Sequence, residues 1–268
     1  TYMLEAAAKY DISVIVLDRP NPLGMLVYGP IREKFGFIGM HPIPIRHGMT
    51  IGELVFMINE EGWLEGGLKV EDLEIIKMKK IPKKTQFYKW TPTSPNIPDK
   101  ETAFVYNGMC LFEGTNLSEG RGTSNPFRTI GAPWVDSNSL MKHIKYLKET
   151  KYGNKVIIKE LEFIPIANKG AKNPKYENQI CYGIFIEYLD ESIEPLDLAI
   201  DLLSYFNQYN DFSFKDSFFD TLYGSSDLRL SITNGDNLDK IMITIKEDVI
   251  KFKELRKDYL MYKQKHKQ

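Results

Sequence analysis

The chain has 268 residues and a formal net charge of -1, because 35 lysine and arginine residues nearly balance 36 aspartate and glutamate residues. This balance excludes a general binder of nucleic acids or anionic membranes, since such proteins carry a basic excess. Hydrophobic residues make up 43% and charged residues 26% of the chain, which excludes global disorder. No apolar run reaches the roughly 18 residues that would predict a transmembrane helix.

The beginning of the chain predicts the second half of a βαβ unit. Residues 2–10 contain three consecutive alanines and favour a helix. Residues 12–17 are a short apolar run, typical of a strand that is buried on both faces of a parallel sheet. Because the strand that would precede this helix is missing, we expect the chain to be a fragment of a longer α/β protein. Residues 18–48 are rich in proline and glycine and predict a structured loop.

Further elements follow from capping signals and apolar spacing. Thr50 and Glu53 form a capping box, which predicts a helix over about residues 50–60. Residues 110–127 start as a strand-like run and continue as a glycine-rich polar loop. In chain order, the other expected elements are a strand at 73–78, a helix at about 137–150 capped by Asp136, strands at 155–166 and 180–189, a helix starting at Glu194 and Pro195, and a final helix with apolar positions Ile245, Val249, Phe252, Leu255, Tyr259 and Tyr262.

Three polar loops are candidates for a functional site. The first follows the predicted strand at 12–17, at the end where open α/β sheets bind ligands. The third combines seven polar or charged residues with three glycines, which fits a polyhydroxylated or anionic ligand. For each loop the alternative is a structural turn whose polar groups satisfy one another. The candidates are Asp18, Arg19 and Asn21; Arg46 and His47; and Glu113, Thr115, Asn116, Ser118, Glu119, Arg121 and Thr123.

Several reaction classes are excluded by missing motifs. The chain has no GK[ST] phosphate loop, no G-x-G-x-x-G after a strand, no paired histidines at metal spacing and no G-x-S-x-G elbow. Cys110 and Cys181 are too few for a disulfide scaffold, and we expect both to be small buried hydrophobic residues. The carboxylates, arginines and amides that remain suit glycoside chemistry, in which one carboxylic acid protonates the leaving oxygen.

Four segments together resemble the exo-β-N-acetylmuramidase (NamZ-type) family of peptidoglycan-degrading glycoside hydrolases, formerly a domain of unknown function. They read LDRPNPLG, RHGMTIGEL, TPTSPNIP and LFEGTNLSEGRGTSNPFRTIGAPW, and FFDTLYGSSDLR and FKELRKDYLMY extend the similarity over nearly the whole chain. The resemblance implies an α/β fold with a partial Rossmann-like catalytic subdomain, which we place at residues 1–140. A smaller α+β subdomain at 141–268 and an active cleft between the two are also implied.

The resemblance also implies an activity. Family members release N-acetylmuramic acid from the non-reducing end of cell-wall glycans and need no organic cofactor. The full-length protein is expected to be secreted or periplasmic. Their favoured acid/base is the Glu of a Ser-Pro-Glu-His-Gly motif that lies upstream and has no copy here. The chain is therefore an exo-muramidase or, as an alternative, a non-catalytic sugar-binding or scaffold fragment. An unrelated nucleotide-binding protein is disfavoured by the missing phosphate motifs.

Roles for the polar residues follow from this substrate class. Muramic acid carries a lactyl carboxylate, for which a guanidinium is the matching partner, and we favour Arg121 for this contact. The residues expected to take part in catalysis are Glu113, Glu119 and His47. The residues expected to bind the substrate are Arg19, Asn21, Arg46, Asn96, Asn116, Arg121 and Thr123.

Overall fold

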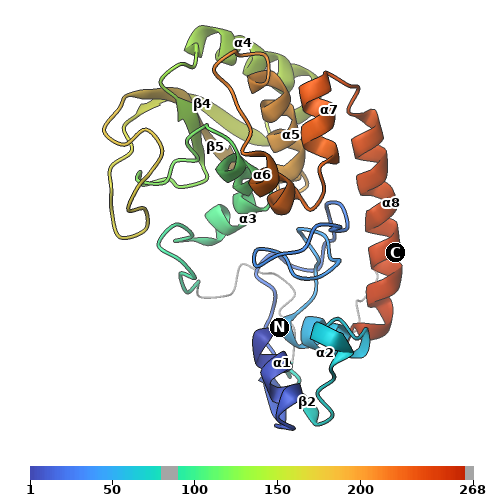
Figure 1. The fold of residues 1–268 in the computed structure, drawn as a ribbon. Helices are drawn as coiled ribbons and strands as arrows, with labels where there is room; N and C mark the ends of the chain where they lie inside the picture. Colours follow the sequence, from blue (N-terminus) through green and yellow to red (C-terminus); the bar gives the residue numbers. More distant parts are fainter. Residues whose placement is uncertain (80–89, 263–268) are drawn as a thin grey trace. The chain divides into compact units, whose positions relative to one another are not determined.

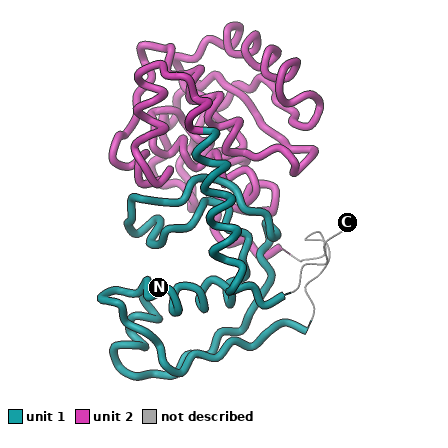
Figure 2. Tube along the Cα trace, turned by 90° about the vertical axis from the view of Figure 1, so that its right-hand side faces the viewer, with its two compact units in different colours: residues 1–89, 242–268 teal, residues 90–241 magenta. Residues whose placement is uncertain are grey.

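The computed structural model describes residues 1–79 and 90–262, which divide into two compact units (Figures 1 and 2). Unit 1 contains residues 1–89 and 242–268, and unit 2 contains residues 90–241. Both helices and strands are present, so the mixed α/β class is confirmed. The units differ from the expected division at residue 140, because a strand on one side of that position pairs with a strand on the other side in unit 2.

Unit 1 is built around two parallel strands. The strand β1 (Val14–Leu17) pairs in register with β2 (Leu73–Ile76), so that Val14 lies opposite Leu73. Helix α2 (Ile51–Glu60) lies between these strands in the chain, and helix α1 (Tyr2–Lys9) precedes them. The predicted sequence of helix, strand, loop and helix is thereby confirmed.

The two strands bury one face only. Val14 and Leu73 pack against a small core, whereas Ile15 and Leu17 on the opposite face are 62% and 73% exposed. The expectation that β1 is buried on both faces is therefore wrong for this structure, because the described helices of unit 1 cover a single face. The buried residues of the core are Leu4, Ala7, Ile58, Leu64 and Val70.

The start of α2 is fixed by side chains that accept its free backbone N–H groups. Thr50 and Glu53 form the predicted capping box, with each side chain accepting from the other residue's backbone. Asp18, which follows β1, accepts from the backbone N–H of Gly52 at 2.8 Å and from the Thr50 hydroxyl at 2.9 Å. A Cβ at Gly52 would lie 2.8 Å from the Asp18 carboxyl carbon, so this approach requires glycine.

The end of the described chain packs onto the same region of unit 1. After α8 (Asp239–Leu255) and the 3-10 turn η5 (Arg256–Tyr259), the Tyr262 hydroxyl donates to Asp18 at 2.5 Å. The Arg256 guanidinium is 5% exposed and donates to three backbone carbonyls. These contacts hold the loop before α2 in place. The carbonyl acceptors are those of Met25 at 3.0 Å, His47 at 3.0 Å and Gly48 at 2.6 Å.

Unit 2 contains an antiparallel sheet with the strand order β3-β5-β4. Its helices pack on the sheet and on one another, with α4 against β4 and β5 and α3 against α5 (Figure 1). The strands are β3 (Thr129–Ala132), β4 (Val156–Phe163) and β5 (Cys181–Tyr188), and the helices are α3 (Lys100–Met109), α4 (Ser137–Leu147), α5 (Pro195–Phe206), α6 (Asp216–Tyr223) and α7 (Asp227–Asn234).

Local signals predicted several of these elements correctly. Asp136 caps α4, and Pro195 stands in the first turn of α5, as expected. Two expectations are wrong. The run from Cys110 continues α3 as a 3-10 turn, η3 (Cys110–Gly114), instead of forming a strand. The final α-helix ends at Leu255, so the apolar spacing that continues beyond it marks a 3-10 turn and an extended segment.

Both cysteines are free and buried, as predicted. In the part of the chain that the structure describes, no helix combines the length and apolar character that crossing a membrane requires.

Candidate functional site

The glycine-rich loop of unit 2, residues 113–127, connects η3 to β3 and is held by backbone contacts. Ser118 exchanges two backbone hydrogen bonds with Gly131 of β3, at 2.8 and 3.1 Å. Gly120 and Gly122 adopt φ angles of +75° and +85°, which L side chains rarely adopt. A Cβ on either glycine would also lie about 2.8–2.9 Å from a neighbouring carbonyl oxygen, so the loop depends on these glycines for its path.

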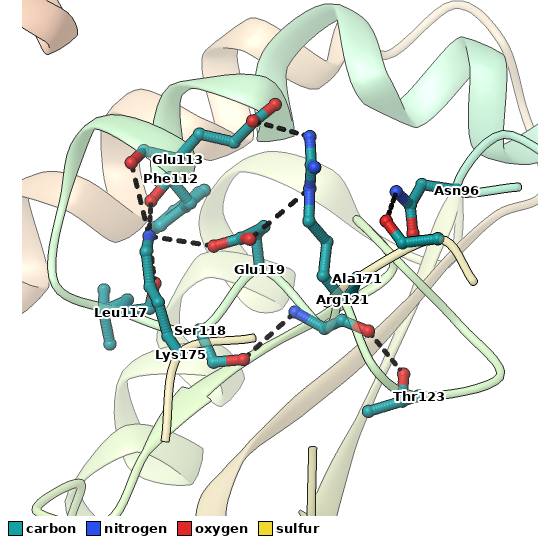
Figure 3. Close-up of polar contacts among 12 residues, drawn as sticks. Asn96, Phe112, Glu113, Leu117, Ser118, Glu119, Arg121, Thr123, Ala171 and Lys175 are labelled. Carbon is teal, nitrogen blue, oxygen red and sulfur yellow. Dashed lines mark hydrogen bonds and ion pairs between the residues drawn. The ribbon is translucent and has the colours of Figure 1, made fainter. Parts of the chain in front are cut away.

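Four ionisable side chains meet inside this loop (Figure 3). The Arg121 guanidinium lies between two carboxylates, with Nη2 at 2.7 Å from Glu113 and Nε at 3.6 Å from Glu119. Lys175, from the connection between β4 and β5, places its Nζ 2.8 Å from the second carboxylate oxygen of Glu119. We call these four residues the ionic cluster. It contains two carboxylates and two cations, so its charges balance when all four groups are ionised.

The members of the ionic cluster differ in their access to solvent. The Glu119 side chain is 6% exposed and has a cation on each side. Glu113 and Arg121 keep 17% and 33% of their side-chain surface exposed. A ligand in solvent can therefore reach Arg121 and Glu113, whereas the position of Glu119 favours a structural role.

Glu113 has the properties of a group that exchanges a proton. Burial raises the pKa of its carboxyl above the ordinary value, and the nearby Arg121 guanidinium opposes this effect only in part. Burial also raises the pKa of the neighbouring Tyr106 hydroxyl, so Tyr106 stays protonated beside Glu113. A carboxyl group that stays protonated at a higher pH than usual can donate its proton to a leaving oxygen.

The other predicted residues of unit 2 hold the backbone. The Thr123 hydroxyl donates to the Gly120 carbonyl at 2.7 Å and turns the loop back on itself. The Asn116 amide donates to the Asp211 carbonyl at 2.6 Å, and the buried Asn96 amide donates to the Gly170 carbonyl at the same distance.

The predicted site residues of unit 1 also form hydrogen bonds within their own loop. Asn21 donates to the Met49 carbonyl at 3.1 Å, and Arg46 is buried and donates to the Leu23 carbonyl at 2.8 Å. Arg19 is exposed, and its backbone N–H donates to Asp18. In this structure Asn21 and Arg46 therefore shape the proline-rich loop, as the alternative reading of that loop anticipates.

His47 lies in a setting that keeps its ring neutral. Burial and the nearby Arg256 guanidinium lower the pKa of His47 to about 4. Its Nδ1 accepts from the Met49 backbone N–H at 3.2 Å, which places the ring proton on Nε2. The expected proton exchange near neutral pH is not supported by these surroundings, although Nε2 can still act as a hydrogen-bond donor.

The depressed pKa of His47 predicts how the stability of unit 1 depends on pH. An unfolded histidine titrates near 6.5 and the folded one near 4, so the unfolded state binds the proton first as the pH falls. Stability is complete above pH 6.5 and is lost toward pH 4, by up to about 3 kcal/mol. We expect His47→Gln, which keeps an acceptor for Met49, to flatten this slope in urea unfolding measured at several pH values. An unchanged slope would show that other groups cause it.

Sequence reasoning missed Lys175 and Tyr106. Lys175 lies in a polar segment without apolar periodicity, and its partners are about 60 residues away along the chain. Tyr106 falls on α3, which was not predicted. The sequence offered one indication of a functional segment here, namely the length of the polar connection between the strands predicted at 155–166 and 180–189.

Comparison with known proteins identifies the family. The family model for the N-terminal domain of exo-beta-N-acetylmuramidase NamZ matches residues 1–101, and the model for the C-terminal domain matches residues 104–262. The chain belongs to the NamZ family. The two matched ranges meet close to the boundary between unit 1 and unit 2 at residue 90.

Individual relatives agree with this assignment. The peptidoglycan beta-N-acetylmuramidase NamZ of Bacillus subtilis (strain 168) is 34% identical over 97% of this chain, which spans 62% of that protein's length. Two solved DUF1343 family proteins from Bacteroides fragilis NCTC 9343 have the same fold, with TM-scores of 0.77 and 0.83 and identities of 36% and 26%. The match covers 97% of this chain and 69% of each of those chains.

Proposed function

We propose that this NamZ-family chain releases N-acetylmuramic acid from the non-reducing end of peptidoglycan fragments, as an exo-acting β-N-acetylmuramidase. The observation that carries this proposal is the 34% identity to the Bacillus subtilis muramidase over 97% of the chain. The ionic cluster supports it, because it places a partly exposed guanidinium next to a carboxyl group with a raised pKa.

In this proposal Glu113 acts as an acid that assists departure of the glycosidic oxygen, in addition to the Glu of the Ser-Pro-Glu-His-Gly motif that the family resemblance implies as the favoured acid/base. Glycosidases need one carboxylic acid that stays protonated while a second group handles water or the anomeric carbon. Partial burial of Glu113 provides the raised pKa, and its 17% exposure leaves the carboxyl accessible to a substrate. The neighbouring Arg121 limits the rise in pKa, so the acid can also lose its proton again during turnover.

Arg121 binds the lactyl carboxylate in this proposal. When Glu113 is protonated, the ionic cluster retains two cations and one carboxylate, which leaves one positive charge in excess at the partly exposed Arg121 guanidinium. An anionic sugar compensates this charge, whereas N-acetylglucosamine, which lacks the lactyl group, does not. Anion binding and protonation of Glu113 therefore support each other.

The test compares the wild-type protein with Glu113→Gln on a chromogenic glycoside of N-acetylmuramic acid. Because Gln cannot donate an acidic proton, we expect the release rate to fall at least ~100-fold. Glu160→Gln, at an exposed position of β4, removes a carboxylate of the same type without touching the ionic cluster and should retain wild-type activity.

Two results would change the proposal. Wild-type release by Glu113→Gln would remove Glu113 from the chemistry. Binding of N-acetylmuramic acid by isothermal titration calorimetry without any release of product would assign a sugar-binding function to this chain instead of hydrolysis.

A further inference from the structure

The connection between β4 and β5, residues 164–180, is packed against the glycine-rich loop of unit 2. Its Ile166 backbone N–H donates to the Gly122 carbonyl at 3.0 Å, and the Trp134 indole N–H donates to the Tyr176 hydroxyl at 3.0 Å. Tyr176 and Asn178 both adopt positive φ angles, of 55° and 60°. Residues other than glycine adopt this conformation at a cost in energy, so the contacts of the connection must hold them there.

Lys175 lies directly before this strained backbone and points into the glycine-rich loop (Figure 3). Its Nζ is 2.8 Å from the carbonyls of Phe112 and Leu117 and 2.8 Å from the Glu119 carboxylate. The Glu113 carbonyl lies slightly farther away, at 3.3 Å. The ammonium group donates hydrogen bonds to these three backbone carbonyls, and it contacts the Glu119 carboxylate as an ion pair.

The contacts of Lys175 connect it to the reactive end of the ionic cluster. It contacts the carbonyls on both sides of the Glu113–Leu117 turn, which fixes the backbone that carries Glu113. It also neutralises Glu119 from the side opposite Arg121, so Arg121 can place Nη2 on Glu113 at 2.7 Å. Without Lys175, Glu119 would have Arg121 as its remaining cation, and Arg121 would be drawn away from Glu113.

Keeping this lysine buried has a cost that its contacts must offset. The Lys175 side chain is 18% exposed, and burial lowers the pKa of its ammonium while Glu119 opposes this effect. A neutral side chain of similar length would avoid the loss of hydration. The Glu119 carboxylate and the surrounding backbone carbonyl oxygens stabilise the charged ammonium group and offset this loss.

We propose that Lys175 is a positioning residue of this site, which holds Glu113 and Arg121 in contact by neutralising Glu119 and fixing the Glu113–Leu117 turn. This inference rests on the proposed function for its consequence in catalysis. The geometric part, the link from Lys175 through Glu119 and Arg121 to Glu113, can be measured without any turnover.

The first experiment measures the pKa of Glu113 by NMR of protein labelled with 13C at the glutamate carboxyl groups, with the signal assigned by Glu113→Gln. Replacement Lys175→Met should raise the pKa of Glu113 by about 1, because Glu113 loses the direct effect of the Lys175 charge and, as Arg121 moves toward Glu119, part of its counter-charge. Lys175→Arg keeps the positive charge and should return the pKa close to the wild-type value. Lys172→Met, an exposed lysine on the same connection, should leave it unchanged.

The second experiment measures kcat and KM on the muramic acid glycoside. A positioning role predicts that Lys175→Met lowers kcat ~10-fold or more with a smaller change in KM, and that the basic limb of the pH profile, where Glu113 loses its proton, moves with the pKa of Glu113. If Lys175→Met does not fold, Lys175→Arg still tests the idea: because it keeps the positive charge, its pKa for Glu113 and its pH profile should both stay close to those of the wild-type protein.

The outcomes separate the two proposals. An unchanged pKa of Glu113 in Lys175→Met, or equal effects of Met and Arg at this position, would overturn the positioning role. A shifted pKa of Glu113 in a protein that never releases N-acetylmuramic acid would support the link between Lys175 and Glu113 and refute the proposed hydrolase function.

Discussion

Replacing Arg256 with methionine is expected to destabilise unit 1 by about 4 kcal/mol, because three partly or fully buried backbone carbonyls lose their donor at once. The Arg256 guanidinium is 5% exposed and donates to Met25, His47 and Gly48 over 2.6–3.0 Å. Methionine fills much of the volume but donates nothing. Each acceptor left unsatisfied in a buried setting costs roughly 1–3 kcal/mol.

Amide hydrogen exchange followed by mass spectrometry reports on this loss locally. Peptides that contain residues 46–53 should exchange ~1,000-fold faster in Arg256→Met, the rate ratio that corresponds to about 4 kcal/mol. Lys257→Met is the matched control, since Lys257 is 66% exposed and forms a surface ion pair with Glu254. Equal protection of residues 46–53 in both variants would show that Arg256 does not hold this loop.

Replacing Arg121 with alanine is expected to abolish most of the preference for N-acetylmuramic acid over N-acetylglucosamine. A charge-assisted contact to a carboxylate contributes roughly 1.5–3 kcal/mol, which corresponds to a ~10- to 100-fold loss in affinity for muramic acid alone. Affinity for N-acetylglucosamine should change little, because that sugar presents no carboxylate to Arg121. Isothermal titration calorimetry with both sugars measures the ratio directly.

The same contact predicts how binding depends on pH. The pKa of Glu113 is raised, so as the pH falls through it from above, Glu113 gains a proton and leaves Arg121 with uncompensated charge. Affinity for muramic acid should therefore rise as the pH falls, while its lactyl carboxylate is still ionised. Glu113→Gln, which is neutral at every pH, should remove this dependence. If Arg121→Ala still binds muramic acid more tightly than N-acetylglucosamine, another group must bind the lactyl carboxylate.

The sequence predicted those parts of the fold that depend on near neighbours. The capping box of Thr50 and Glu53 and the cap at Asp136 each satisfy backbone N–H groups within three residues, so spacing alone reveals them. The apolar run at β1 predicted a strand correctly, but its burial depends on which elements cover each face. No local pattern contains that information, and Ile15 and Leu17 are exposed as a result.

The candidate site shows the same limit. Density of polar residues between glycines singled out Glu113, Glu119 and Arg121, and the structure brings these three together. The density of polar residues could not predict which carboxylate is accessible to a ligand. That difference depends on burial, which encloses Glu119 and leaves Glu113 accessible. Lys175 reaches its carbonyl partners across 58 and 63 residues of sequence, so only the packing of the β4–β5 connection reveals it.

Unit 1 is assembled from two stretches of chain that are far apart, whereas unit 2 is one continuous stretch between them. During synthesis from the amino end, residues 90–241 leave the ribosome as a complete unit and can fold at once. The loop around Gly48 must wait for Arg256, and Asp18 for Tyr262, until more than 200 further residues have been made. A nascent chain arrested after residue 241 would thus contain a finished ionic cluster in unit 2 while unit 1 still lacked its C-terminal stretch.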